Sequence, residues 1–156
     1  MGDTAAGTVT DETADPSATE RPFRVMPAVT VDNEHFWRGG AEGELRILRC
    51  NGCGYWIHPP APICPECLGR DVAPQAVSGE ATVLTFTVNR QLWYPNLDPP
   101  YVIAIVQLPE QADLRLTTNI VGCEPDDVTF GMPVRVVFEE YPDSRGSVWL
   151  PFFEPA

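Results

Sequence analysis

The chain has 156 residues, a length that suits one ordinary domain or two small ones. Hydrophobic residues make up 44% of it, enough to build a core, and no run approaches the roughly 20 apolar residues that span a bilayer. The formal net charge is −12, with ten arginines and no lysine, which disfavours binding to nucleic acid because phosphate neutralisation dominates that binding. The start lacks the basic flank and apolar run of a secretory signal, so we expect a soluble cytoplasmic protein, not bound to membranes, with reduced cysteines.

The N-terminal part of the chain divides at about residue 22. Residues 1–22 have almost nothing to bury, which predicts a disordered tail or a linker. The stretch "TVDNEHFWRGG" predicts a short helix with Asp32 as its N-cap, and Gly39–Gly40 should stop or kink it. The aromatic face of this helix packs either on the protein's own core or on a partner.

Four of the five cysteines lie in the stretch "RCNGCGYWIHPPAPICPECLG". The residues "ELRILRC", which lead into it, alternate as a strand would. They form two Cys-x-x-Cys pairs with ten residues between them, a pattern that favours zinc over disulfides in a reducing compartment. The predicted ligands of this structural zinc are Cys50, Cys53, Cys64 and Cys67. An iron in the same cage or an unmetallated remnant are the alternatives. Four thiolates leave no open position, so the metal should be structural, with His58 outside the ligand set.

The rest of the chain alternates turn residues with short β-branched and aromatic runs. Strands are predicted over 80–92, 101–108, 114–121 and 134–141, and "SVWLPFF" adds a last edge strand that Pro151 should end. About five strands with no helix between them indicate a small closed or partly closed β-barrel. The lone Cys123 is read as a small buried residue.

Several separated motifs, in order, resemble one family from end to end. They are "DNEHFWRGGAEGELRILRCNGCGYWIHPPAPICPEC", "SGEATVLTFTVN", "PPYVIAIVQL", "NIVGCEPDDVTFGMPVRVVFEE" and "LPFFEPA". Over about residues 31–156 the chain is similar to the acyl-CoA-associated family of zinc-ribbon plus OB-fold proteins, long called a domain of unknown function. The resemblance implies a mainly β fold: a helical segment over 23–44, a rubredoxin-like zinc ribbon over 45–73 and a C-terminal OB-fold barrel over 74–156.

The resemblance also implies a function. Members are similar to small subunits that accompany thiolase-superfamily enzymes acting on CoA thioesters, and some are fused to or paired with hot-dog-fold enoyl-CoA hydratases. The stretches "DPPYVIAIVQL" and "LPFFEPA" look close to the branch that associates with a lipid-transfer-protein-like thiolase, which performs a retro-aldol cleavage in bacterial steroid side-chain breakdown. The chain is therefore expected to be a non-catalytic accessory subunit of a CoA-thioester lyase (aldolase), supporting that partner and shaping its acyl-CoA channel. A condensing thiolase or a hydratase is the alternative partner.

Two other classes of function compete with that of a partner subunit. An OB-fold barrel often binds single-stranded nucleic acid, but residues 75–156 carry four arginines against eleven acidic residues. A free-standing enzyme would need a nucleophile and base, and no such set or catalytic motif is present.

Aromatic and arginine side chains are the candidate contacts with the partner and with acyl-CoA. Interfaces favour aromatic side chains at their centres, and the partner-binding candidates are Phe36, Trp37, Trp56, Trp93 and Tyr94. Each is equally well explained as core. The only local basic cluster is the candidate contact for the CoA phosphates, and it consists of Arg38, Arg46 and Arg49. The alternative is that these arginines simply screen the charge of the zinc thiolates.

Overall fold

The computed structural model describes residues 23–156, so the predicted tail or linker over 1–22 lies outside the described residues. The first helix, α1 (Glu34–Arg38), continues directly into a 3-10 turn, η1 (Gly39–Glu42), so the α-helix does stop at Gly39. The N-cap prediction was wrong: Asn33 takes that position, and its side-chain oxygen accepts a hydrogen bond from the Thr30 N–H at 2.8 Å.

A close approach of two segments explains the glycine at position 40. A methyl group there would lie 2.5 Å from Cβ of Trp149 and 2.7 Å from Cδ1 of Phe138. Only glycine lets η1 come this close to the barrel strands that carry those two side chains.

A three-stranded antiparallel sheet forms the zinc-ribbon part, in the order β2-β1-β3. Its strands are β1 (Arg46–Cys50), β2 (Trp56–Ile57) and β3 (Val72–Ala76). The first Cys-x-x-Cys pair forms the turn between β1 and β2, and the second pair lies in the loop between β2 and β3. Because β3 pairs with β1 from Val72 to Ala76, this sheet extends across the predicted boundary between residues 73 and 74.

Five further strands close a barrel in the order β4-β5-β6-β8-β7, which confirms the predicted mainly β fold with an OB-fold barrel. The strands are β4 (Glu80–Asn89), β5 (Tyr101–Gln107), β6 (Arg115–Ile120), β7 (Pro133–Tyr141) and β8 (Val148–Pro155), with a 3-10 turn, η2 (Pro125–Asp127), between β6 and β7. All neighbours are antiparallel except β6 and β8, which are parallel and share a single register pair, Ile120↔Phe153.

The prediction that Pro151 ends an edge strand was wrong, because β8 lies between β6 and β7 and runs through Pro151 to Pro155. Proline cannot donate a ladder hydrogen bond. The Val121 N–H donates to the Phe153 carbonyl at 2.8 Å, so the backbone groups of Phe153, and by alternation those of Pro151, face β6. Since β6 and β8 are paired only near Phe153, the missing N–H breaks no ladder.

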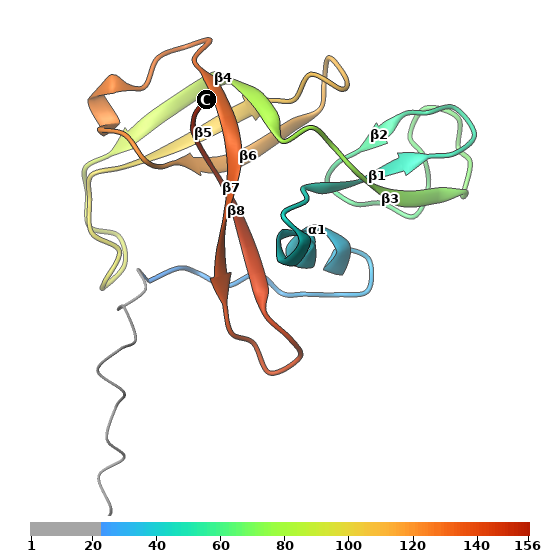
Figure 1. The fold of residues 1–156 in the computed structure, drawn as a ribbon, viewed down its shortest axis with the longest axis horizontal. Helices are drawn as coiled ribbons and strands as arrows, with labels where there is room; N and C mark the ends of the chain where they lie inside the picture. The colour runs from blue at the N-terminus through green and yellow to red at the C-terminus, as the bar shows by residue number, and fades with distance from the viewer. Residues whose placement is uncertain (1–22) are drawn as a thin grey trace, which may run out of the picture.

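One hydrophobic cluster joins the two sheets. Leu45, Ile47 and Trp56 from the ribbon side pack in the same cluster as Phe36 and barrel residues such as Val106. Figure 1 shows the small sheet beside the barrel, with α1 at their junction. Between residues 23 and 156, no helix is both long and apolar enough to cross a membrane.

Candidate functional site

The four predicted cysteine ligands come together at one point. Their sulfur atoms all lie within 4.8 Å of one another, with 3.6 Å from Cys50 to Cys67 and from Cys53 to Cys64. A tetrahedral zinc with bonds of about 2.3 Å requires sulfur separations of about 3.8 Å. The donor set therefore fits one four-coordinate zinc ion in a structural role, with no ligand position left for a substrate.

The two cysteine turns have the same backbone design. The Gly54 N–H donates to the Cys50 carbonyl at 2.8 Å, and the Leu68 N–H donates to the Cys64 carbonyl at 3.0 Å. The residue after each second cysteine has a positive φ, 79° at Gly54 and 61° at Leu68. Glycine adopts this conformation freely, whereas a leucine there is a strained exception.

Backbone amides favour the thiolate form at one position of the sulfur cluster. Hydrogen bonds from backbone N–H groups, first that of Cys53 and also that of Gly52, lower the pKa of the Cys50 thiol to about 7. A Cβ added at Gly69 would lie 3.2 Å from the Cys67 sulfur, so the chain passes close to the cluster where it leaves it. Cys50 and Cys64 are buried, while Cys53 and Cys67 are exposed.

The loop between β5 and β6 clamps the ribbon to the barrel, a feature that the sequence analysis missed. The Gln111 side-chain oxygen accepts from the Trp56 N–H at 2.9 Å, and the Gln111 amide donates to the Trp56 carbonyl at 3.1 Å. Beside it the Tyr55 hydroxyl donates to Asp113 at 2.7 Å. That hydrogen bond lowers the pKa of the Asp113 carboxyl and raises the pKa of the Tyr55 hydroxyl. No local sequence pattern predicts these contacts, because the partners are separated by 55 positions in one pair and by 58 positions in the other.

The five candidate partner-binding aromatics divide between core and surface. Phe36 and Trp56 are only 6% and 9% exposed and belong to the core cluster, and Trp37 packs against that cluster with its ring edge-on to Phe36. The side chains of Phe36 and Trp56 therefore offer almost no surface to a partner. Trp93 and Tyr94 are 72% and 52% exposed, so the structure does not bring the five together.

Internal contacts brace the loop that carries the exposed aromatics, residues 90–100, which we call the aromatic loop. The Trp93 indole N–H donates to the Asn89 side chain at 2.7 Å, and Tyr94 stacks on Phe23 with ring centroids 6.1 Å apart. At the start of the loop, Arg90 forms an ion pair with Asp126. The aromatic loop thus holds exposed apolar side chains in a defined arrangement.

A second exposed aromatic lies on the barrel. Phe130 is 71% exposed and contacts the ring of Phe86 on β4, with centroids 5.2 Å apart. The sequence did not distinguish Phe130 from a core residue, because a single aromatic in a turn shows no periodicity.

The three candidate CoA-binding arginines already have internal partners. Arg46 forms ion pairs with Glu42 at 2.6 Å and Glu44 at 2.8 Å. Arg38 donates to the Arg145 carbonyl at 2.7 Å. A phosphate would have to share these arginines with the groups that hold them.

Arg49 supports the first cysteine turn directly. Its guanidinium donates to the Gly54 carbonyl at 3.0 Å and lies 5.0 Å from the centre of the Trp56 ring.

The remaining reactive side chains are poorly placed for chemistry. His58 lies outside the sulfur cluster and packs on Phe36 with centroids 5.1 Å apart. Burial, and then the positive charge of His35, lower the pKa of His58 to about 4. Cys123 is half-buried, and burial followed by the charges of Asp127 and Glu124 raises the pKa of its thiol.

Family models match both halves of the described chain. Residues 37–73 match the rubredoxin-like zinc ribbon domain of ChsH2, and residues 74–139 match the C-terminal OB-fold domain of ChsH2. The match to the zinc ribbon agrees with the sulfur geometry, so the chain carries a ribbon whose four clustered cysteines could bind zinc structurally.

Individual proteins give the same picture. The chain is 34% identical over 136 residues to the probable enoyl-CoA hydratase alpha subunit of Thermomonospora curvata. The aligned region covers 87% of this chain but only 41% of that protein. It is 39% identical over 105 residues to a DUF35 domain-containing scaffold protein of Methanocaldococcus jannaschii, covering 65% of this chain and 73% of that one.

A solved structure matches at the level of the whole fold. A chain of the Ltp2-ChsH2(DUF35) aldolase superposes with a TM-score of 0.72 at 35% identity, covering 83% of this chain and 98% of that chain. These matches, together with the zinc ribbon and the closed five-stranded barrel, show that the chain belongs to the DUF35 family, with a ChsH2-type zinc ribbon followed by a ChsH2-type OB fold.

Proposed function

We propose that this chain is the non-catalytic accessory subunit of a lyase complex, in which a thiolase-superfamily partner cleaves a CoA thioester by a retro-aldol reaction. The observation that carries the proposal is the match to the DUF35 chain of the Ltp2-ChsH2(DUF35) aldolase, which covers 98% of that chain. The proposed substrate is a CoA thioester from steroid side-chain breakdown, and this class follows from the family resemblance. The partner would supply the nucleophile, acid and base.

The chemistry of the described residues supports a role without catalysis. The Cys123 thiol has a raised pKa, which disfavours the nucleophilic thiolate, and His58 packs on Phe36 as a neutral ring. The four remaining cysteines form the sulfur cluster, which leaves zinc no open position.

The aromatic loop is the proposed docking site for the partner. Leu92, Trp93 and Tyr94 are all more than half exposed on a loop that the Arg90–Asp126 pair and the Asn89 side chain already hold in place. A loop ordered in advance loses little conformational entropy on binding, so its apolar area contributes more fully to affinity. Exposed aromatics of this kind are typical of the energetic centres of interfaces.

The partner test uses co-expression with thiolase-like proteins encoded beside this chain, followed by co-purification and an assay of acyl-CoA cleavage. Alone, the chain should show no turnover; with its partner it should form a stable hetero-oligomer, which we propose contains two copies of each chain. Turnover by the isolated chain, or no stable complex with any such partner, would contradict the proposal.

The docking test changes Trp93 and Tyr94 together to Ala. Complex affinity or cleavage rate should fall at least tenfold while the thermal stability of the isolated chain changes little, because both side chains are exposed. Val31→Ala, at an 85% exposed apolar side chain, is the matched control and should leave the complex intact. If affinity and cleavage rate both stay unchanged, the docking site lies elsewhere, and the helix that carries Phe36 and Trp37 is the next candidate.

A hydratase is the second candidate partner. It is favoured by the 34% identity to a probable enoyl-CoA hydratase alpha subunit, of which this chain spans about two fifths. Hydration assays on the same co-purified complexes separate the two: a complex that hydrates an enoyl-CoA without cleaving its side chain would favour this alternative.

The acyl-CoA contacts of the complex are proposed at Arg38, Arg46 and Arg49. Support comes from their closeness along the sequence; Arg46 shares its charge with Glu42 and Glu44, so its contribution should be modest. In the complex, Arg46→Gln should raise the KM for acyl-CoA more than it lowers kcat. An unchanged KM would remove Arg46 from the CoA site.

A further inference from the structure

The barrel has an open seam between β6 and β8. These two parallel strands share only the register pair Ile120↔Phe153, and toward Thr118 and Pro151 the strands are bridged by a side chain instead: the Thr118 hydroxyl donates to the Pro151 carbonyl at 3.0 Å. Incomplete pairing leaves room beside the barrel wall, and a cavity of about 420 Å³ lies there.

This cavity has the size and lining of a small-molecule site. Its volume falls in the range of about 300–1,000 Å³ that such pockets occupy. The walls come from five separate parts of the chain, and their apolar members include Trp37, Leu97, Ile103, Ile120, Leu150 and Phe152. A few polar groups stand among them, chiefly Arg24, Thr117 and Asn119.

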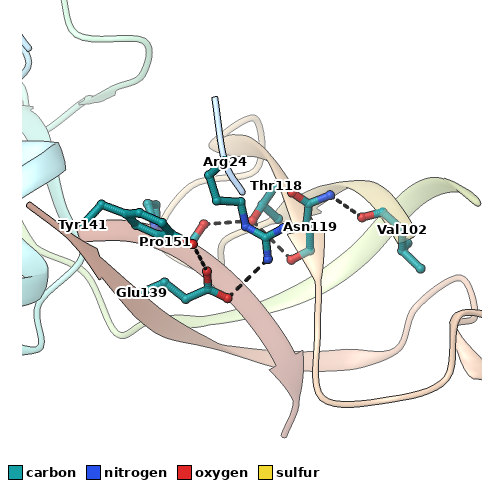
Figure 2. A network of polar contacts seen from close by, with 7 residues as sticks. All are labelled: Arg24, Val102, Thr118, Asn119, Glu139, Tyr141 and Pro151. Carbon is teal, nitrogen blue, oxygen red and sulfur yellow. Dashed lines mark hydrogen bonds and ion pairs between the residues drawn. The ribbon is translucent and has the colours of Figure 1, made fainter. Parts of the chain in front are cut away.

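Arg24 is the polar group that indicates the ligand's chemistry. Its guanidinium donates to Glu139 at 3.3 Å and lies 4.8 Å from the centre of the Phe152 ring, while Tyr141 donates to the other oxygen of Glu139 at 2.9 Å. Figure 2 shows Arg24 between this Glu139–Tyr141 pair on one side and Thr118 and Asn119 of β6 on the other. The charge of Arg24 is therefore already compensated by a carboxylate.

One donor of Arg24 is left unused. Its Nε–H is buried and has no hydrogen-bond partner in the structure. A buried donor without a partner costs free energy, and an acceptor in the cavity would recover it once a small rotation of the Arg24 side chain turns the Nε–H toward the cavity. Because Glu139 already balances the charge of the guanidinium, a second anion would gain little net electrostatic attraction there, so the donor suits a neutral oxygen.

From this geometry we propose that the seam cavity binds a small apolar molecule with one neutral acceptor oxygen, such as a ketone, an ester or an amide carbonyl. The apolar body lies against Trp37, Ile103 and Leu150, and the carbonyl oxygen accepts the Arg24 Nε–H. This site requires no partner protein, and it stands or falls separately from the docking role of the chain.

The experiment is a titration of the isolated chain followed by ¹H–¹⁵N NMR of the arginine Nε–H groups. Three probes with medium-length alkyl chains and different head groups are used: 2-undecanone, decanoate and decylammonium. The ketone should bind one-to-one and shift the Arg24 Nε–H resonance, and both charged probes should bind at least tenfold more weakly. Decanoate binding more tightly than the ketone would overturn the neutral-acceptor assignment.

Three variants locate the site. Arg24→Met keeps an unbranched apolar stem without the donor and should weaken ketone binding about tenfold. Arg115→Met removes the same charge from β6 outside the cavity and should change nothing, since Arg115 does not line it. Ile103→Trp fills the cavity from a position that is 38% exposed and should abolish binding. No ketone binding to the unaltered chain, or equal binding to Ile103→Trp, would overturn the proposal.

Discussion

At the scale of single residues, the zinc site shows which features of a turn a sequence can carry. The spacing of the cysteines and the glycine after Cys53 are local properties, and the structure brings the four sulfurs within 4.8 Å as that spacing predicted. The second turn reaches the same backbone geometry with Leu68 at a φ of 61°, and the side chain is 75% exposed there. Metal coordination is the interaction that can hold a leucine in this conformation, because structural zinc is a source of folding free energy.

The first prediction concerns the metal ligands. Cys53→Ser should release zinc and lower the thermal stability markedly, since structural zinc in small domains contributes on the order of 10 kcal/mol to folding. Elemental analysis of the purified protein should fall from one zinc per chain to less than one half. Cys123→Ser is the matched control, because Cys123 lies outside the sulfur cluster, and it should keep its zinc. A Cys53→Ser protein that keeps both metal and stability would refute the four-ligand site.

The second prediction concerns the pH dependence of stability. Burial lowers the pKa of folded His58 to about 4, below its usual 6.5, so the folded state binds fewer protons than the unfolded state. The stabilisation is complete above pH 6.5 and is lost as the pH falls toward 4. Between pH 7 and pH 5 the loss amounts to about 2 kcal/mol.

Chemical unfolding at the two pH values measures this effect. The unaltered protein is compared with the variant His58→Gln, because protonation of the zinc thiolates in acid destabilises both equally. Between pH 7 and pH 5 the free energy of unfolding of the variant should fall by about 2 kcal/mol less than that of the unaltered protein. An identical fall in the two proteins would show that His58 does not titrate in this range.

At the scale of elements, packing against distant neighbours decides local geometry. The segment from α1 through η1 lies against β7 and β8 so closely that position 40 has no space for a side chain. The same proximity explains why the pair Gly39–Gly40 does not simply terminate a helix: the chain continues as a 3-10 turn along the barrel surface.

The third prediction tests this contact. Gly40→Ala places a methyl group 2.5 Å from Cβ of Trp149, and overpacking of this kind costs about 1–3 kcal/mol. The melting temperature should therefore fall by several degrees. Gly52→Ala is the control, because its methyl group would meet nothing nearer than 3.7 Å, and it should change stability far less. Equal stability of the two variants would mean that η1 moves away from the barrel without cost.

At the scale of the whole molecule, two features stand out: the contacts that hold the ribbon sheet on the barrel, and the negative charge of the barrel. Gln111 and Asp113 join the barrel to Trp56 and Tyr55 of the ribbon, and a shared hydrophobic cluster backs that junction. The molecule therefore presents the sulfur cluster, the aromatic loop and the barrel surface as one rigid arrangement. Its barrel half is strongly acidic, with four arginines against eleven acidic residues over 75–156.

The fourth prediction follows from that charge. The chain should show no measurable affinity for single-stranded DNA or RNA at physiological salt, because neutralisation of phosphates supplies most of such binding. Fluorescence anisotropy with a labelled oligonucleotide is the measurement. A micromolar or tighter dissociation constant that weakens steeply with salt would restore nucleic acid as a ligand of this barrel.

The features that the sequence determined by itself are those coded by neighbouring residues. Strand periodicity located the first four barrel strands to within three residues at each end, and cysteine spacing located the metal site, because both depend on short-range geometry. The end of β8 could not be read this way: Pro151 normally stops a strand, and only the incomplete pairing of β6 and β8 makes it harmless.

Only the tertiary structure decided which side chains face solvent. Phe36, Trp56, Trp93 and Tyr94 look alike as aromatics in a sequence, yet the first two are core and the last two are exposed. Their burial depends on which segments fold over them, and so does the seam cavity, which combines Arg24 with residues more than ninety positions away. Burial depends on how the folded chain packs, whereas the spacing of the cysteine ligands is fixed by the amino-acid sequence itself.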